Sequence, residues 1–149
     1  MARVSTITIG VQMYQALEAF IGKTITGTFY PPQTAGSDGG DVAVRGADAT
    51  TEDAVLTVSG ATAGQIQTGK ARLNIYEQDI DCGLPNKVAD TARLQAIAEK
   101  AEDLLTQLNG ADTDYLFDLA QAPTASAVPG KAEHFVNFTF SFKRITLNE

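Results

Sequence analysis

Several residue types that carry specific chemistry are almost absent from this chain of 149 residues. It contains one cysteine, Cys82, one histidine, His134, and no tryptophan. A single thiol can form neither an internal disulfide nor a structural zinc site, so both of these ways of stabilising a small fold are excluded. The hydrophobic core, which draws on 44% apolar residues, therefore has to hold the fold together.

Basic residues are also scarce. The chain has 11 Lys and Arg against 18 Asp and Glu, which gives a net charge of −7. Because nucleic-acid affinity comes largely from Lys and Arg that displace counterions from phosphates, we do not expect tight binding of DNA or RNA. No stretch approaches the roughly 18 apolar residues that a membrane helix needs. We therefore expect a soluble protein that is neither exported nor bound to a membrane.

Bulky apolar side chains are nearly lacking between residues 33 and 53. A segment rich in Gly, Ala and Asp buries too little surface to offset the entropy lost on ordering. We expect a mobile acidic loop at about 33–53, which can include a short strand at 42–44. We interpret its carboxylates as solvated surface groups. The charged residues of this loop are Asp38, Asp41, Arg45, Asp48, Glu52 and Asp53.

The clearest pattern that is present lies in residues 134–143. Apolar and polar residues alternate there with the two-residue period of a strand, so one face of that strand is apolar. We expect this face to pack on a helix and to share a core with Leu104, while Thr139 and Ser141 face away from that helix. The alternating apolar residues are Val136, Phe138, Phe140 and Phe142.

Two segments have the periodicity of amphipathic helices. The second is the stronger: Asp90 can cap its start, and Asn109-Gly110 closes it. The first can be capped by Ser5, Thr6 or Thr8 and ends near Gly22. The apolar positions of the first helix are Val11, Tyr14, Leu17 and Ile21, and those of the second are Leu94, Ile97, Ala98, Ala101, Leu104, Leu105 and Leu108.

Shorter signals indicate the remaining elements. A segment rich in β-formers predicts a strand at 24–30 that ends at Pro31-Pro32, since proline cannot donate to a ladder. A hairpin joins strands at 54–59 and 65–79. We also expect a strand at 115–119, loops at 80–88 and 122–130, and a bulge or emerging tail at 143–144, where the final alternation breaks.

This order of elements lacks the βαβ alternation of a doubly wound sheet. The sequence therefore predicts one α+β domain over residues 1–149. We expect a single antiparallel or mixed sheet, with both helices packed on one face, a long hairpin and a flexible loop.

No catalytic, cofactor-binding or metal-binding set stands out, and we predict none. His134 has no recognisable nucleophile beside it, and Cys82 has acidic neighbours, whereas a reactive cysteine needs a positive environment. The pairs Glu77 with Asp79, and Asp79 with Asp81, can act as acid and base only if the fold supplies a pocket that separates their pKa values.

Other motifs fall short in the same way. Residues 112–115 lack the glycine and the glutamate of a calcium loop. The glycines at 36, 39 and 40 neither follow a strong strand nor open a helix, so they do not predict a phosphate-binding loop. Tyr14, Tyr76 and Tyr115 lie in periodic segments, which favours core or sheet positions over a base-stacking platform.

Three segments together resemble a known layout. They are the strand Lys70-Ala-Arg-Leu-Asn-Ile-Tyr-Glu-Gln-Asp79, the helix Leu94-Gln-Ala-Ile-Ala-Glu-Lys-Ala-Glu-Asp-Leu-Leu105 and the final strand with its Phe-x-Phe-x-Phe pattern. Over roughly residues 9–147 the chain resembles the tail-terminator and tail-completion proteins of long-tailed bacteriophages. The acidic insertion at 33–53 departs from that family's usual pattern.

The resemblance implies a non-enzymatic structural subunit of the virion, assembled in the host cytoplasm. It implies a homo-oligomeric ring, commonly a hexamer, at the end of the tail tube or in the neck that joins tail to head. The partners would be further copies of the chain and other tail-tube, neck or connector proteins. DNA would pass through the lumen without specific binding, which the acidic net charge suits.

Two other classes of function stay open. A monomeric ligand- or carbohydrate-binding module would present exposed aromatic residues on a sheet face. A small carboxylate-dependent enzyme would need acidic groups clustered in a pocket. Light scattering separates these classes, because only the ring hypothesis predicts a defined assembly.

Overall fold

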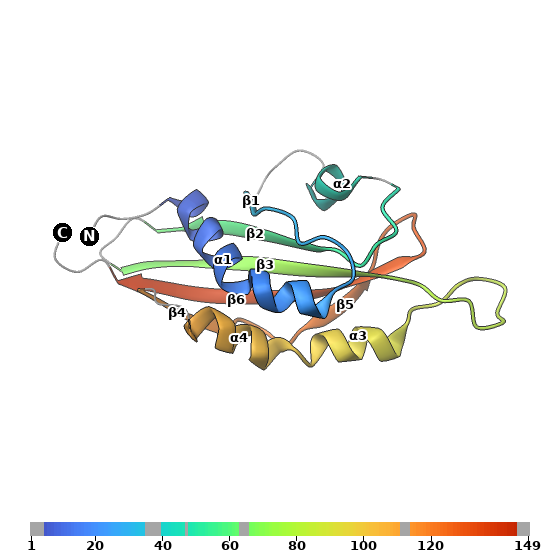
Figure 1. Cartoon of the computed structure of the whole chain (residues 1–149). Helices are drawn as coiled ribbons and strands as arrows, with labels where there is room; N and C mark the ends of the chain where they lie inside the picture. Colours follow the sequence, from blue (N-terminus) through green and yellow to red (C-terminus); the bar gives the residue numbers. More distant parts are fainter. Residues whose placement is uncertain (1–4, 35–39, 47, 63–65, 111–113, 146–149) are drawn as a thin grey trace.

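The computed structural model describes residues 5–34, 40–46, 48–62, 66–110 and 114–145. They form one six-stranded sheet with helices packed against it (Figure 1). This confirms the predicted α+β class. The helices are α1 (Thr6–Thr24), α2 (Gly40–Arg45), α3 (Thr91–Ala98) and α4 (Ala101–Gly110). The strands are β1 (Gln33–Thr34), β2 (Ala54–Ala61), β3 (Ile66–Gln78), β4 (Tyr115–Leu119), β5 (Thr124–Ala127) and β6 (Glu133–Ile145).

The sheet is antiparallel apart from one edge. Its order is β1-β2-β3-β6-β4, and β1 pairs with β2 in parallel. The two long strands β3 and β6 pair from Ile66↔Ile145 to Gln78↔Glu133. Both β4 and β5 pair with the other edge of β6, β4 near its end and β5 near its start.

The core lies between the sheet and α1, α3 and α4. The even-numbered face of β6 is buried there, and Phe138, Phe140 and Leu104 are each 0% exposed in one hydrophobic cluster. This confirms the predicted shared core. Val11, which we expected on the buried stripe of the first helix, is instead 41% exposed. The stripe of α1 is formed by Ile9, Met13, Leu17 and Ile21.

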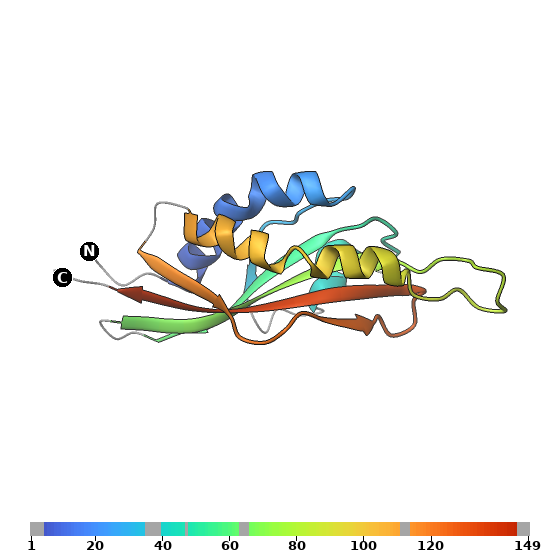
Figure 2. The ribbon, with the colours of Figure 1, turned by 90° about the horizontal axis from the view of Figure 1, so that it is seen from below.

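The two faces of the sheet are covered differently. Figures 1 and 2 show α1, α3 and α4 together along one face, whereas α2 lies by itself over the other. The alternation of side chains along β3 agrees with this arrangement. Leu73 and Ile75 face the core, so Asn74 and Tyr76 face the other side of the sheet, where both bond Asp41 of α2. We call the side that bears α2 the open face. None of the described helices is long and apolar enough to cross a membrane.

The strand expected at 24–30 is not present. Helix α1 continues past Gly22 to Thr24, and only Phe29 makes an isolated parallel bridge, to Ala54. The backbone between them bonds to Glu52 and Asp53 instead of to a ladder. Gly27 permits this close approach, because a Cβ there would overlap the Glu52 carbonyl oxygen and the Asp53 carboxylate.

The acidic segment differs from the expected unpacked loop. It contains β1 and α2, so residues 42–44 are helical and do not form a strand. Glu52 and Asp53 are buried, at 7% and 0% exposure, because basic side chains elsewhere in the fold meet them. Residues 35–39 and 47 lie outside the described part, and the mobility of the segment stays a prediction.

Three further features differ from those that the sequence indicated. The second helix is divided into α3 and α4, where Lys100 N–H donates to the Ile97 carbonyl in a tighter turn. The expected loop at 122–130 contains β5, whose small side chains are exposed and give no apolar pattern. The final strand shows no bulge at 143–144; Arg144 faces the core side, with its guanidinium 5.8 Å from the Tyr115 ring centroid.

Candidate functional site

A buried ionic cluster joins α2 to the sheet. The Arg45 side chain is 4% exposed and lies between the carboxylates of Asp53 and Glu133, both 0% exposed. Its Nε donates to Asp53 at 3.0 Å, and two other nitrogens donate to Glu133 at 3.0 and 2.9 Å. Burial disfavours the charged guanidinium, but the bonds to Glu133 and then Asp53 outweigh burial and raise the pKa of Arg45.

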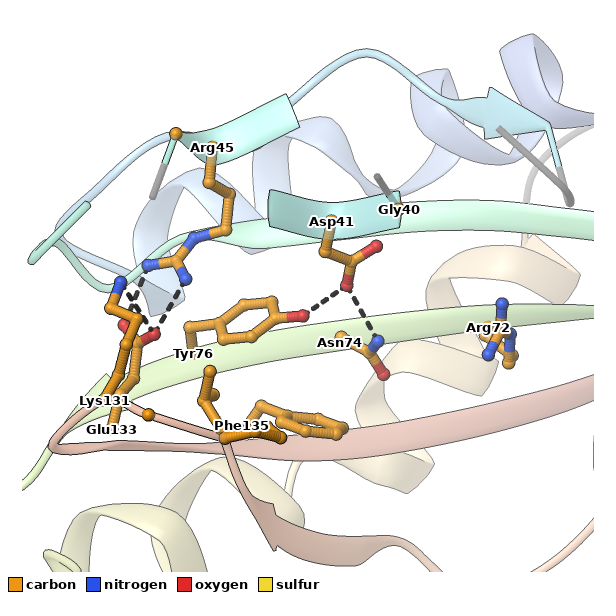
Figure 3. Close-up of a pocket in the computed structure, with 13 residues that line it drawn as sticks. Gly40, Asp41, Arg45, Arg72, Asn74, Tyr76, Lys131, Glu133 and Phe135 are labelled. Carbon is orange, nitrogen blue, oxygen red and sulfur yellow. Dashed lines mark hydrogen bonds and ion pairs between the residues drawn. The ribbon is translucent and has the colours of Figure 1, made fainter. Parts of the chain in front are cut away.

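A cavity of about 560 Å³ lies beside this cluster, between α2, the open face and the turn before β6. Figure 3 shows Arg45 and Lys131 converging on Glu133 at one end, and Asp41 bonding Tyr76 and Asn74 across the middle. Burial, and then the Asp41 carboxylate, raise the pKa of the Tyr76 hydroxyl, so this group stays a proton donor.

The cavity leaves one cation available. Arg45 and Lys131 are occupied by Glu133, whereas Arg72 is exposed and forms no ion pair with any carboxylate of the described residues. Phe135 lines the same space, with its ring centroid 5.3 Å from that of Tyr76. The recess can therefore take a group that combines a negative charge with a flat apolar part.

A second cluster, on the helix side, brings two carboxyl groups to one arginine. Glu52 accepts from Arg93 Nε at 2.8 Å, and Glu77 Oε2 lies 3.9 Å from the same nitrogen. Burial, followed by the neighbouring Glu52, raises the pKa of Glu77 to about 8. Burial opposes ionisation of Glu52 as well, but its bonds to Arg93 lower its pKa overall. At neutral pH the pair therefore holds one proton, on Glu77.

The cluster of Glu52, Glu77 and Arg93 connects several elements of the fold. Arg93 also donates to the Thr24 carbonyl at the end of α1, so it ties α3 to both α1 and the Glu52 segment. The sequence suggested Glu77 as an acid–base candidate but paired it with Asp79. In the structure the partner of Glu77 is Glu52, which lies 25 positions earlier in the sequence. No local sequence pattern indicated this pair.

The other candidates are placed separately. His134 Nδ1 lies 2.6 Å from Asp79 Oδ1, at the end of the sheet. Cys82 and Asp81 are exposed in the segment between β3 and α3, which extends beyond the sheet (Figure 1). The structure thus joins His134 with Asp79 and does not bring Cys82 to them.

The remaining motifs give no site. Gly40 does open a helix, contrary to our expectation, but α2 has only six residues. Residues 36, 39, 112 and 113 lie outside the described part. Tyr14 and Tyr115 are half-buried, and their hydroxyls donate to the Phe29 carbonyl and to Gln12. Among the described residues no group of three His, Cys, Asp or Glu could hold a metal ion.

Comparison with known protein families and with curated proteins gave no match to this chain.

Proposed function

We propose that this protein is a structural subunit of a bacteriophage virion that assembles into a homo-oligomeric ring, as its resemblance to tail-terminator and tail-completion proteins implies. The observation that supports this most is the open face. Three helices cover one side of the sheet, whereas on the other side the described residues leave β3, β6 and β4 uncovered beyond the cavity.

The open face has the features of a contact surface. Ile66 and Leu116 are 53% and 65% exposed on it. Ile66 pairs with Ile145 of β6, and the polar residues Thr68 and Lys143 lie beside this apolar group. Exposed apolar residues rimmed by polar ones are typical of protein–protein contacts. An antiparallel sheet can leave one face in water, so the exposed apolar residues, and not the uncovered face alone, favour a second copy as the cover.

The segment between β3 and α3 provides a second contact element. Its base is closed by the bridge Ile80↔Val88, and its Leu84 is 57% exposed (Figure 1). Loops that project from a rigid scaffold commonly carry binding residues.

The net charge suits a ring around DNA. With 18 acidic against 11 basic residues, the subunit carries a net negative charge, which disfavours tight binding of phosphates. In the proposed ring, DNA passes through the lumen without specific binding, and the ring contacts tail-tube or neck proteins at its two ends. The number of subunits, commonly six in the family that the chain resembles, stays part of the proposal.

Sedimentation velocity and negative-stain electron microscopy of the purified full chain test the proposal. We expect a single defined oligomer that appears as a ring. A protein that sediments only as a monomer at tens of micromolar in low salt would overturn the proposal.

The cavity favours a second candidate function, a monomeric module that binds a small ligand. Benzoate combines a carboxylate with a flat ring and is a suitable probe for Arg72 and Phe135, with glucose as a neutral comparison. If the chain is monomeric and titration with benzoate shifts NMR signals from these two residues, the binding module replaces the ring.

A further inference from the structure

We infer that neighbouring copies in the ring contact each other through two faces of opposite charge. The open face of one copy lies against the outer side of α3 and α4 of the next. This inference rests on the proposed ring and adds to it the surfaces that join the subunits.

Three cations lie close together on the open face. Lys70 pairs across the sheet with Ser141, Arg72 with Thr139, and Lys143 with Thr68. Lys70 therefore lies next to Arg72 along β3 and diagonally opposite Lys143 on the same face. We call Lys70, Arg72 and Lys143 the basic patch. All three are exposed, and the one acidic residue of β4 on this face, Asp118, forms no ion pair with them.

The basic patch is unfavourable in an isolated subunit. Like charges at neighbouring sheet positions repel one another. No carboxylate in the described part of the chain pairs with the patch, although the sequence has 18 acidic residues and a net charge of −7. A partner that brings carboxylates to this face would remove the repulsion.

The opposite side of the molecule carries such carboxylates. Glu99 ends α3, and Glu102 and Asp103 lie in the first turn of α4. We call these three residues the acidic patch. All are exposed, whereas Ala101 and Leu104 beside them are buried toward the sheet. Within the described residues none of the three forms an ion pair, and Glu99 accepts only from Gln95.

The arrangement favours one type of symmetry. A two-fold contact would place a patch against its own copy, which sets like charges together. Two unlike faces on opposite sides of a subunit instead match head to tail, and such contacts close into a ring when the rotation permits. Complementary potentials also suppress the wrong register.

Charge reversal tests this inference directly. One variant carries Lys70→Glu, Arg72→Glu and Lys143→Glu, and the other carries Glu99→Lys, Glu102→Lys and Asp103→Lys. In each variant both contact faces have the same sign, so we expect the subunit–subunit dissociation constant to rise about tenfold or more. Lys23→Glu, an exposed reversal on α1, is the matched control and should leave assembly unchanged. Circular dichroism and thermal melts check that each variant is folded.

Mixing the two variants is the decisive step. A head-to-tail contact predicts that an equimolar mixture assembles again, with the two variants alternating, and that one chain with all six substitutions also assembles. Recovery of this kind supports the inference. Assembly of either variant as in the wild type, or loss of assembly without recovery on mixing, overturns the inference while the ring itself stands. A wild type that does not assemble overturns both.

The same variants separate a nucleic-acid role from a subunit contact. If the wild type binds double-stranded DNA at physiological salt, and the basic-patch variant loses this binding but still assembles, the patch serves nucleic acid and the inference is wrong.

Discussion

Arg45 is a buried cation that contacts several groups at the open face. Its guanidinium contacts two carboxylates that are 0% exposed. It also donates to the Thr51 carbonyl and lies 4.0 Å from the centroid of the Tyr76 ring. A buried ion pair adds little net stability compared with an apolar replacement, but removal of one partner leaves the other charge unpaired. The cluster therefore fixes where α2 lies, and it makes the fold sensitive to single substitutions.

Arg45→Ala should destabilise the protein by about 3 to 5 kcal/mol, because Asp53 would be left buried without a cation and Glu133 would keep only Lys131. Arg72→Ala, an exposed arginine on the same face, should change stability by less than about 0.5 kcal/mol. Urea denaturation of both variants measures the difference. Similar midpoints would mean that Arg45 is not essential to the packing of this face.

Phe140→Ala should cost about 3 to 5 kcal/mol, since Phe140 is 0% exposed in the main core. Thr139→Ala is the matched control on the same strand, because Thr139 points to the open face and, within the described part of the chain, its hydroxyl bonds only to Asn137. We expect a loss below about 1 kcal/mol for this control. Equal losses in urea melts would show that the register of β6 is wrong.

Glu77 should make stability fall as pH rises. Its pKa is about 8 in the folded protein, whereas a solvated glutamate has a pKa of about 4.5, so the folded state holds a proton that the unfolded state releases. This contribution is full below about pH 4.5 and is lost as pH rises toward 8. Glu52, whose pKa is lowered, acts in the opposite direction at acidic pH.

Urea denaturation of the wild type and of Glu77→Gln between pH 5 and 9 isolates the effect of Glu77. The stability of the variant should decline less over this range, because glutamine does not titrate. Parallel curves for the two proteins would contradict the raised pKa.

At the scale of elements, α2 is the feature that shapes the open face. Helix α2 has six residues, too few to be stable alone, so contacts with β3 and β6 have to hold it. Asp41 supplies two of them, to Asn74 and Tyr76, and Arg45 supplies the others at the opposite end of the helix. Helix α2 covers one end of the open face, and the described residues leave the rest of that face uncovered.

Asp41→Ala should therefore loosen α2 without disturbing the sheet. Hydrogen exchange of the amides in residues 40–45 should become faster, while exchange in β3 and β6 stays as in the wild type. Asp48→Ala, a change at an exposed carboxylate of the same segment, is the control. Unchanged exchange in residues 40–45 would show that Asp41 does not anchor the helix.

At the scale of the whole molecule, charge is distributed unevenly between two faces. The chain carries −7, yet three of its 11 basic residues form the basic patch on the open face. The helix side carries the acidic patch. An isolated subunit gains nothing from this separation, whereas a head-to-tail ring pairs the two patches at every contact.

The proposed ring should weaken as salt rises. Contacts between exposed charges are screened over about 10 Å at 0.1 M ionic strength and about 3 Å at 1 M. Sedimentation velocity at increasing sodium chloride concentrations should show a shift from oligomer to monomer. A ring that becomes more stable with salt would instead be held mainly by apolar contacts.

Local periodicity in the sequence determined the core of this protein. The alternation in residues 134–143 and the stripe of the second helix predict which side chains are buried, because burial on one face follows from strand or helix geometry alone. These segments lie in β6, α3 and α4, and Phe138, Phe140 and Leu104 share the core as expected. The hairpin strands and β4 were also indicated by their own residues.

Tertiary structure alone decided the open face and its clusters. Arg45 meets Glu133 across 88 positions, and Glu52 meets Arg93 across 41, so no window of sequence contains both partners. Helix α2 and β5 lack an apolar pattern of their own and form where other strands offer hydrogen bonds and counter-charges. The burial of Asp53 follows for the same physical reason: a carboxylate in a polar segment is solvated by default, and only a cation placed there by the rest of the fold can offset its loss of water.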